Sequence, residues 1–68
     1  MNAYEMQART LKAAKLVNHL RRSGIGYEAA QMLREDQWKI YANGAGLKTP
    51  PSAETRRMVL EMLKEGQP

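Results

Sequence analysis

Small or apolar residues along the first third of the chain recur at the spacing of a helix. Between about Ala3 and Ser23 they occur every three to four positions, at Met6, Thr10, Ala13, Leu16, Val17 and Leu20. At 100° per residue these positions share one side of a helix, which we expect to face the core. Gly24 follows, where a left-handed residue commonly ends a helix. Residues 3–23 are therefore predicted to form the first helix.

The second helical segment is predicted over residues 27–42, and it has a less regular pattern. Helix-favouring residues fill it, and Asn43-Gly44-Ala45-Gly46 follows as a stop. In one straight helix, Asp36 and Gln37 would share a stripe with the apolar residues and would face the core. Those apolar residues are Ala29, Ala30, Leu33 and Ile40. A break near 34–36 would remove the conflict, with Asp36 capping a short further helix, and the pattern leaves both arrangements open.

The last helix is predicted over residues 52–65, after a loop that contains Pro50 and Pro51. Ser52 is expected to cap it. Its apolar face is formed by Thr55, Met58, Val59, Met62 and Leu63. Because no segment has the alternation of a strand, the sequence predicts an all-α fold. We expect a single small domain, residues 1–68, built as a bundle of three to five helices with a helix-turn-helix-like arrangement.

Composition narrows the chemistry that the chain can support. A chain of 68 residues with no Cys and one His lacks the ligands for a thiolate zinc site and cannot form a disulfide. We expect no catalytic residue, metal or cofactor, and no enzyme activity. No apolar run approaches the roughly 20 residues that span a bilayer, so we expect a cytoplasmic protein without membrane contact. Because so small a core gains from self-association, a homodimer is a further expectation.

Basic charge is concentrated at the start of the chain. The sequence has 11 Lys and Arg against 7 Asp and Glu, a formal net charge of +4. Lys12, Lys15, His19 and Arg22, which we call the basic stripe, recur at helical spacing on the side roughly opposite the apolar face. This spacing is suited to a phosphate backbone, although exposed helices also carry such rows without a ligand. The stripe is therefore both a candidate nucleic-acid contact and a candidate solvated surface.

Trp38 and Tyr41 lie one helical turn apart, and the chain has no Phe. Aromatic side chains supply the largest apolar area to a small core. They are also common anchors at binding surfaces. Both roles remain open for this pair.

Three stretches of sequence together resemble the phage-repressor or Cro-like helix-turn-helix family over residues 23–65. They are Ser23-Gly24-Ile25 leading into Glu28-Ala29-Ala30-Gln31-Met32-Leu33, then Trp38-Lys39-Ile40-Tyr41-Ala42-Asn43-Gly44, then Pro51-Ser52-Ala53-Glu54-Thr55. The resemblance implies a supporting helix, a recognition helix and a closing helix. The last stretch is also similar to the closing helix of lactose-repressor-type headpieces. The turn is about two residues shorter than is usual in the family, and the recognition segment carries Glu35 and Asp36.

The resemblance implies a small transcriptional regulator of phage or plasmid type that binds double-stranded DNA. Contacts in the groove would come from Gln37, Trp38, Lys39 and Tyr41, and contacts to phosphates from the basic stripe with Lys48, Arg56 and Arg57. The alternative is a small helical protein-interaction module, an inhibitor or adaptor. In that alternative residues 27–42 stay one helix, and Trp38 or Met32 anchors the partner. A break in this helix therefore favours the DNA-binding hypothesis over the alternative.

Overall fold

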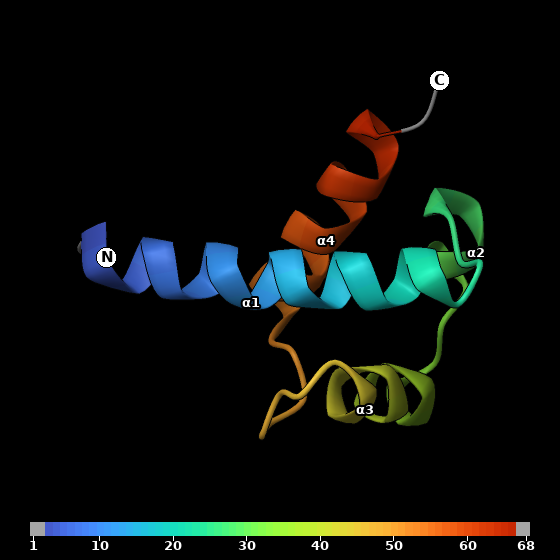
Figure 1. Cartoon of the computed structure of the whole chain (residues 1–68), viewed down its shortest axis with the longest axis horizontal. Helices are drawn as coiled ribbons and strands as arrows, with labels where there is room; N and C mark the ends of the chain where they lie inside the picture. Colours follow the sequence, from blue (N-terminus) through green and yellow to red (C-terminus); the bar gives the residue numbers. More distant parts are fainter. Residues whose placement is uncertain (1–2, 67–68) are drawn as a thin grey trace.

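The computed structural model describes residues 3–66, with side chains from residue 7 onward. These residues form four helices and no strand: α1 (Ala3–Arg22), α2 (Tyr27–Gln31), α3 (Glu35–Gly44) and α4 (Ala53–Glu65). Figure 1 shows α4 crossing α1, with α3 on the other side of α1 and α2 near the carboxyl end of α1. The predicted small all-α bundle is confirmed. Met6 was also predicted to face the core, but its side chain lies outside the described part of the structure.

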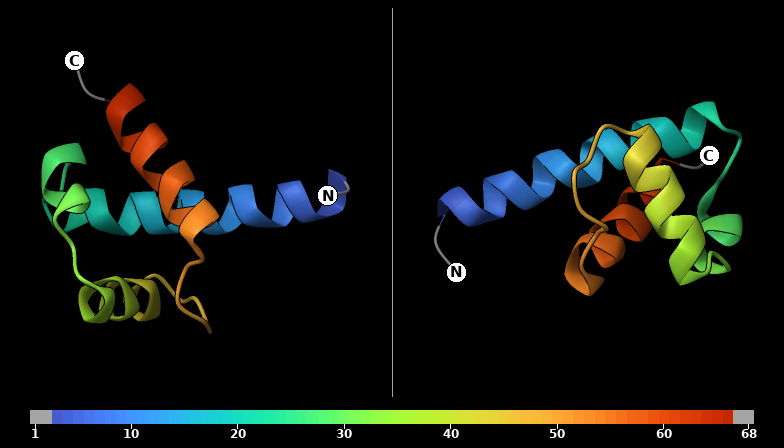
Figure 2. Two further views of the ribbon diagram at one scale, coloured as in Figure 1. Left: turned by 180° about the vertical axis from the view of Figure 1, so that it is seen from behind. Right: turned by 90° about the horizontal axis from the view of Figure 1, so that it is seen from below.

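The core lies where α1 crosses α4. Leu16 and Leu20 of α1 and Val59 of α4 are completely buried, with 0% of their surface exposed. Leu63 of α4 is 2% exposed. The predicted apolar face of α1 is thus confirmed from Ala13 to Leu20, whereas Thr10, predicted on the same face, is exposed because it lies on the part of α1 that projects beyond the core. The amino-terminal part of α1 projects beyond the other three helices in both Figure 1 and Figure 2.

The ends of α1 and α3 use the same backbone arrangement. After α1, Gly24 has a φ of 80°, and the N–H of Ile25 donates to the carbonyl of Leu20 at 2.9 Å. After α3, Gly46 has a φ of 86°, and the N–H of Leu47 donates to the carbonyl of Ala42 at 2.9 Å. This left-handed glycine followed by an apolar residue is the Schellman motif, which satisfies the last carbonyls of a helix. Ile25 and Leu47 then pack against the core, so each motif ends a helix and returns the chain to the core.

Residues 27–42 form two helices, because α2 ends at Gln31 and α3 begins at Glu35. The predicted cap was wrong, since the N-cap position is Arg34 and Asp36 lies in the first turn of α3. The backbone N–H of Arg34 donates to Gln37 Oε1 at 2.9 Å. Asp36 Oδ1 instead accepts from the backbone N–H of Gln37 at 3.0 Å. Starting α3 two residues earlier leaves Asp36 exposed to water.

The break also changes which side of α3 faces the core. Trp38 and Ala42 are buried, with 4% and 1% of their surface exposed, whereas Ile40 is 65% exposed. In a straight helix Ile40 was expected to lie in the buried stripe. The structure differs because the three residues between α2 and α3 rotate α3 so that Trp38 packs into the core cluster instead.

The predicted start of α4 is confirmed in detail. Ser52 occupies the N-cap position, and its Oγ accepts from the backbone N–H of Thr55 at 3.2 Å. The two hydroxyl oxygens of Ser52 and Thr55 lie 3.0 Å apart. Thr55 is 4% exposed, so its hydroxyl is buried with a hydrogen-bond partner.

Candidate nucleic-acid interface

The basic stripe lies along the side of α1 that borders α3 and the following loop. Lys12, Lys15 and Arg22 are exposed, and His19 is half-buried. Lys15, His19 and Arg22 line a groove of about 300 Å³ whose other wall is formed by Gly44, Ala45 and Gly46. The stripe therefore forms one wall of a groove rather than an isolated solvated face.

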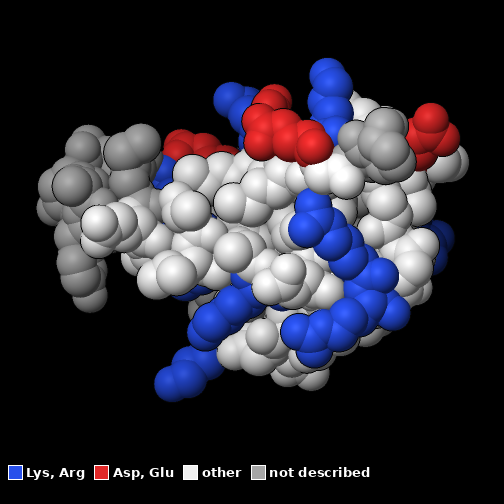
Figure 3. All heavy atoms as spheres, turned by 45° about the horizontal axis from the view of Figure 1, so that its top comes forward, with Lys and Arg blue, Asp and Glu red and all other residues white. Residues whose placement is uncertain are grey.

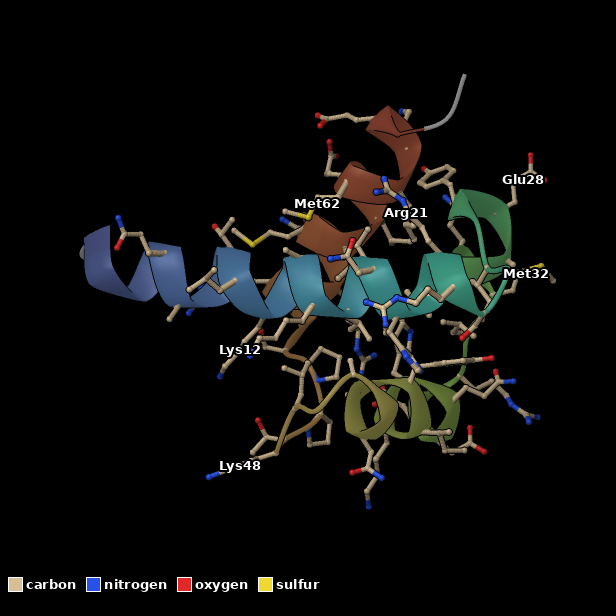
Figure 4. The ribbon with its side chains drawn as sticks, in the orientation of Figure 1. Lys12, Arg21, Glu28, Met32, Lys48 and Met62 are labelled. Carbon is tan, nitrogen blue, oxygen red and sulfur yellow. The ribbon has the colours of Figure 1, made fainter. Side chains whose placement is uncertain are left out.

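A second groove of about 240 Å³ extends the basic surface toward the amino-terminal half of α1. Arg9 and Lys12 line it together with Leu47, Pro51 and neighbouring residues. Figure 4 shows Lys12 pointing from α1 toward the side on which the loop carries Lys48. Lys48 is exposed, so this loop adds a fourth cation beside the stripe.

Four cations of this surface, Lys12, Lys15, Arg22 and Lys48, have no carboxylate partner among residues 7–66, whereas Arg9 is paired with Glu54. Ion pairs in this part of the chain join Arg9 to Glu54, Arg34 to Asp36 and Arg56 to Glu35, and none includes Lys12, Lys15, Arg22 or Lys48. Neither groove has an Asp or Glu in its lining. In Figure 3 Lys and Arg side chains gather across the middle and lower part of the visible face, whereas the visible carboxylates lie along its upper edge beside further Lys and Arg side chains. The charge of the stripe is therefore not neutralised by an ion pair with any carboxylate whose side chain the structure describes.

His19 holds the stripe against the carboxyl end of α3. Its ring is tilted by 58° against the ring of Tyr41, with 6.1 Å between the centroids. Its Nε2 also approaches the backbone of Gly44 so closely that a Cβ there would lie only 2.6 Å away. Tyr41, a predicted groove contact, is half-buried and takes part in this packing instead.

Of the other predicted groove contacts on α3, only Lys39 is free to reach a partner. Trp38 is 4% exposed, so its predicted place in a DNA groove was wrong and its other predicted role, in the core, is correct. The side chain of Gln37 accepts the hydrogen bond at the start of α3. Lys39 is exposed, together with Ile40 and Asn43 on the outer side of α3.

Arg56, predicted to contact phosphate, instead joins α4 to α3. Its Nη1 and Nη2 donate to Glu35 Oε1 and Oε2 at 2.7 and 2.6 Å, and its guanidinium lies 5.5 Å from the centroid of the Trp38 ring. The hydrogen bonds from Arg56, and its charge, lower the pKa of Glu35 below the ordinary value of 4.5. Glu35 in turn raises the pKa of Arg56. The guanidinium is thus occupied within the molecule, whereas Arg57 is exposed.

The sequence pattern did not indicate two of these contacts. Glu35 and Arg56 are 21 positions apart on different helices, and no helical or strand period connects them. His19 and Gly44 are likewise on different helices, α1 and α3. From the sequence Gly44 was interpreted as part of the stop after residue 42, whereas α3 extends to Gly44, so its contact with His19 appeared only in the structure.

The chain was compared with protein-family models, with curated proteins and with solved structures, and no match was found in any of the three comparisons. Within the described residues, no helix has the length and apolar character needed to cross a membrane. Over the same residues no three His, Cys, Asp or Glu side chains gather in a way that could hold a metal ion.

Proposed function

We propose that this protein is a small DNA-binding regulator whose basic stripe holds the phosphate backbone. The observation that carries the proposal is the row of cations from Lys12 to Arg22, which lack carboxylate partners among the described side chains. At 1.5 Å per residue the row is about 15 Å long. One DNA strand places about four phosphates along that length of helix axis, at 3.4 Å each. The stripe with Lys48 therefore matches the charge and length of a short backbone segment.

The contribution of α3 would be sequence readout. The separation of α2 from α3 is the arrangement expected for the helix-turn-helix resemblance and not for one continuous helix. The exposed Lys39 and Asn43 can donate hydrogen bonds to base edges. At the amino-terminal end of α3, Glu35 is occupied by Arg56 and Asp36 is paired with Arg34, whereas Lys39 and Asn43 are exposed nearer its carboxyl-terminal end, so the helix would approach DNA with that part. Lys39→Ala should then weaken specific binding, and Arg22→Ala should lower the salt slope by about one.

The test is fluorescence anisotropy of a labelled DNA duplex with two double variants that each remove two positive charges. Lys15→Gln with Arg22→Gln changes the stripe. Arg34→Gln with Lys64→Gln, both exposed and outside the proposed surface, is the matched control. We expect the first pair to weaken binding much more than the second, because only the first removes phosphate contacts. Equal loss in both would mean that net charge alone attracts DNA, and the proposed surface would be wrong.

The second candidate function, a protein-interaction module, is favoured by one observation. Met32 is 82% exposed and Ile40 is 65% exposed, so both large apolar side chains are accessible to a protein partner. Its premise of one helix over residues 27–42 is wrong, and Trp38 is buried, so Met32 is the remaining predicted anchor. A duplex-binding signal that Met32→Ser leaves intact, and that stripe variants abolish, would count against this candidate.

A further inference from the structure

The groove between the basic stripe and the end of α3 has one closely fitted wall. Gly44 lies in α3 and its φ is not positive, so the backbone there would accept any L residue. A Cβ at this position, however, would lie 2.6 Å from His19 Nε2 and 3.0 Å from Cε1. A side chain at this position would therefore displace the imidazole, whereas the glycine allows the imidazole to lie directly against the backbone of α3.

The other wall of the groove, formed by α1, supplies the donors of Lys15, His19 and Arg22, together with the amide of Asn18, which can both donate and accept. Lys15 offers three N–H donors and Arg22 five, and an imidazole offers at least one in either protonation state. Among the described side chains, no carboxylate lines the groove. The nearby helix-end carbonyls of Tyr41, Ala42 and Asn43 already accept from backbone N–H groups at 2.9 to 3.0 Å.

The groove has a volume of about 300 Å³, and two positively charged side chains and an imidazole line it. A small anion with several acceptor oxygens would complement these donors. The same cations could instead only offset the negative ends of α1 and α3. The contacts of His19 with Gly44 and Tyr41 hold the imidazole at the wall of the groove, a placement that anion binding uses and that charge compensation at a helix end does not need.

We propose that this groove seats one phosphate group, with Lys15 and Arg22 supplying charge and His19 an N–H donor. The inference rests on the proposed function in one respect: the phosphate is taken to belong to a DNA backbone. The seat would fix which phosphate meets the stripe, and so would set the register of the protein on the duplex.

The first experiment is a double-mutant cycle on duplex binding with His19→Ala, Gly44→Ala and both together. Gly44→Ala must displace the imidazole, yet alanine suits a helix, so the thermal unfolding midpoint should change by no more than about 5 °C. Loss of one hydrogen bond predicts about two- to tenfold weaker binding for each single variant. Because both changes remove the same contact, the double variant should bind no more weakly than His19→Ala.

A Gly44→Ala protein that binds duplex like the parent would overturn the inference while leaving the proposed function in place. The inference would also be overturned if Gly44→Ala weakened duplex binding equally in the parent and in the His19→Ala protein. The effect of Gly44→Ala would then not depend on the imidazole.

The second experiment is an NMR titration of the parent with inorganic phosphate against chloride at matched ionic strength. We expect saturable, phosphate-specific shifts at the His19 ring and the amides of Gly44 and Gly46, lost in Lys15→Gln. Such shifts in a protein that does not bind duplex would support the seat for free phosphate and reject the proposed DNA function. Shifts no larger than those with chloride would overturn the inference, even if the stripe variants had confirmed DNA binding.

Discussion

Replacing Trp38 by Ala should remove a large part of the stability of this protein. The side chain is 4% exposed, and a buried aromatic side chain removes about 150–250 Å² from water. At about 25 cal/mol per Å² that area corresponds to roughly 4–6 kcal/mol, of which the remaining Cβ retains a part. Measured Trp→Ala changes in cores cost about 3–5 kcal/mol, which is the loss we expect. A domain of this length has a total free energy of unfolding of about 3–10 kcal/mol, so the variant should lose between about a third and all of its stability at 25 °C.

The assay is urea unfolding followed by circular dichroism, with Met32→Ala as the control. Met32 is also a large apolar side chain, but it is 82% exposed, so its loss should change the free energy of unfolding by less than about 0.5 kcal/mol. A loss below about 1 kcal/mol for Trp38→Ala would refute the placement of Trp38 in the core. Because Trp38 is the single Trp of the chain, acrylamide quenching of the parent gives a second readout, and added duplex should leave it unchanged.

Three further predictions concern the contacts that hold the helices. Ser52→Ala should lower the free energy of unfolding by about 1 kcal/mol in urea titrations, through loss of the N-cap bond, and Ser52→Asp should lose much less. Gly46→Ala should cost about 1–2 kcal/mol, because an L residue is strained at a φ of 86°, and Gly46→Asn should restore part of it. Because Arg56 lowers the pKa of Glu35 below 4.5, their interaction stabilises the fold above the unfolded-state pKa and is lost as pH falls through the folded-state value. As the pH is lowered from about 6 to about 2.5, the thermal unfolding midpoint should therefore fall less in Glu35→Gln than in the parent protein. An identical fall in both proteins would contradict the pairing.

The sequence predicted best those features that a few neighbouring residues determine. Gly24 and Ser52 end and begin their helices as expected, because a left-handed turn and a hydroxyl cap depend only on residues within one turn. The apolar face of α1 was also predicted, since it is long and regular. For these elements, local spacing and local hydrogen bonds were sufficient.

The details of α3 could not be predicted, because they depend on contacts across the fold. Asp36 is a good cap residue, and by local preference it was the reasonable choice. The helix instead begins earlier, which brings Trp38 rather than Ile40 into the core. Only packing against α1 and α4 determines that rotation. For the same reason the pairing of Arg56 with Glu35, and of His19 with Gly44, appeared only in the structure.

The most direct test of the proposed function is the salt dependence of duplex binding by the unmodified protein, measured by anisotropy between about 50 and 200 mM salt. Lys12, Lys15, Arg22 and Lys48 would neutralise about four phosphates, which predicts a slope of about −3.6 for log K against log salt and roughly a 150-fold loss of affinity over this range. A slope near zero, or no binding at the lowest salt, would contradict a phosphate-binding role for the basic stripe.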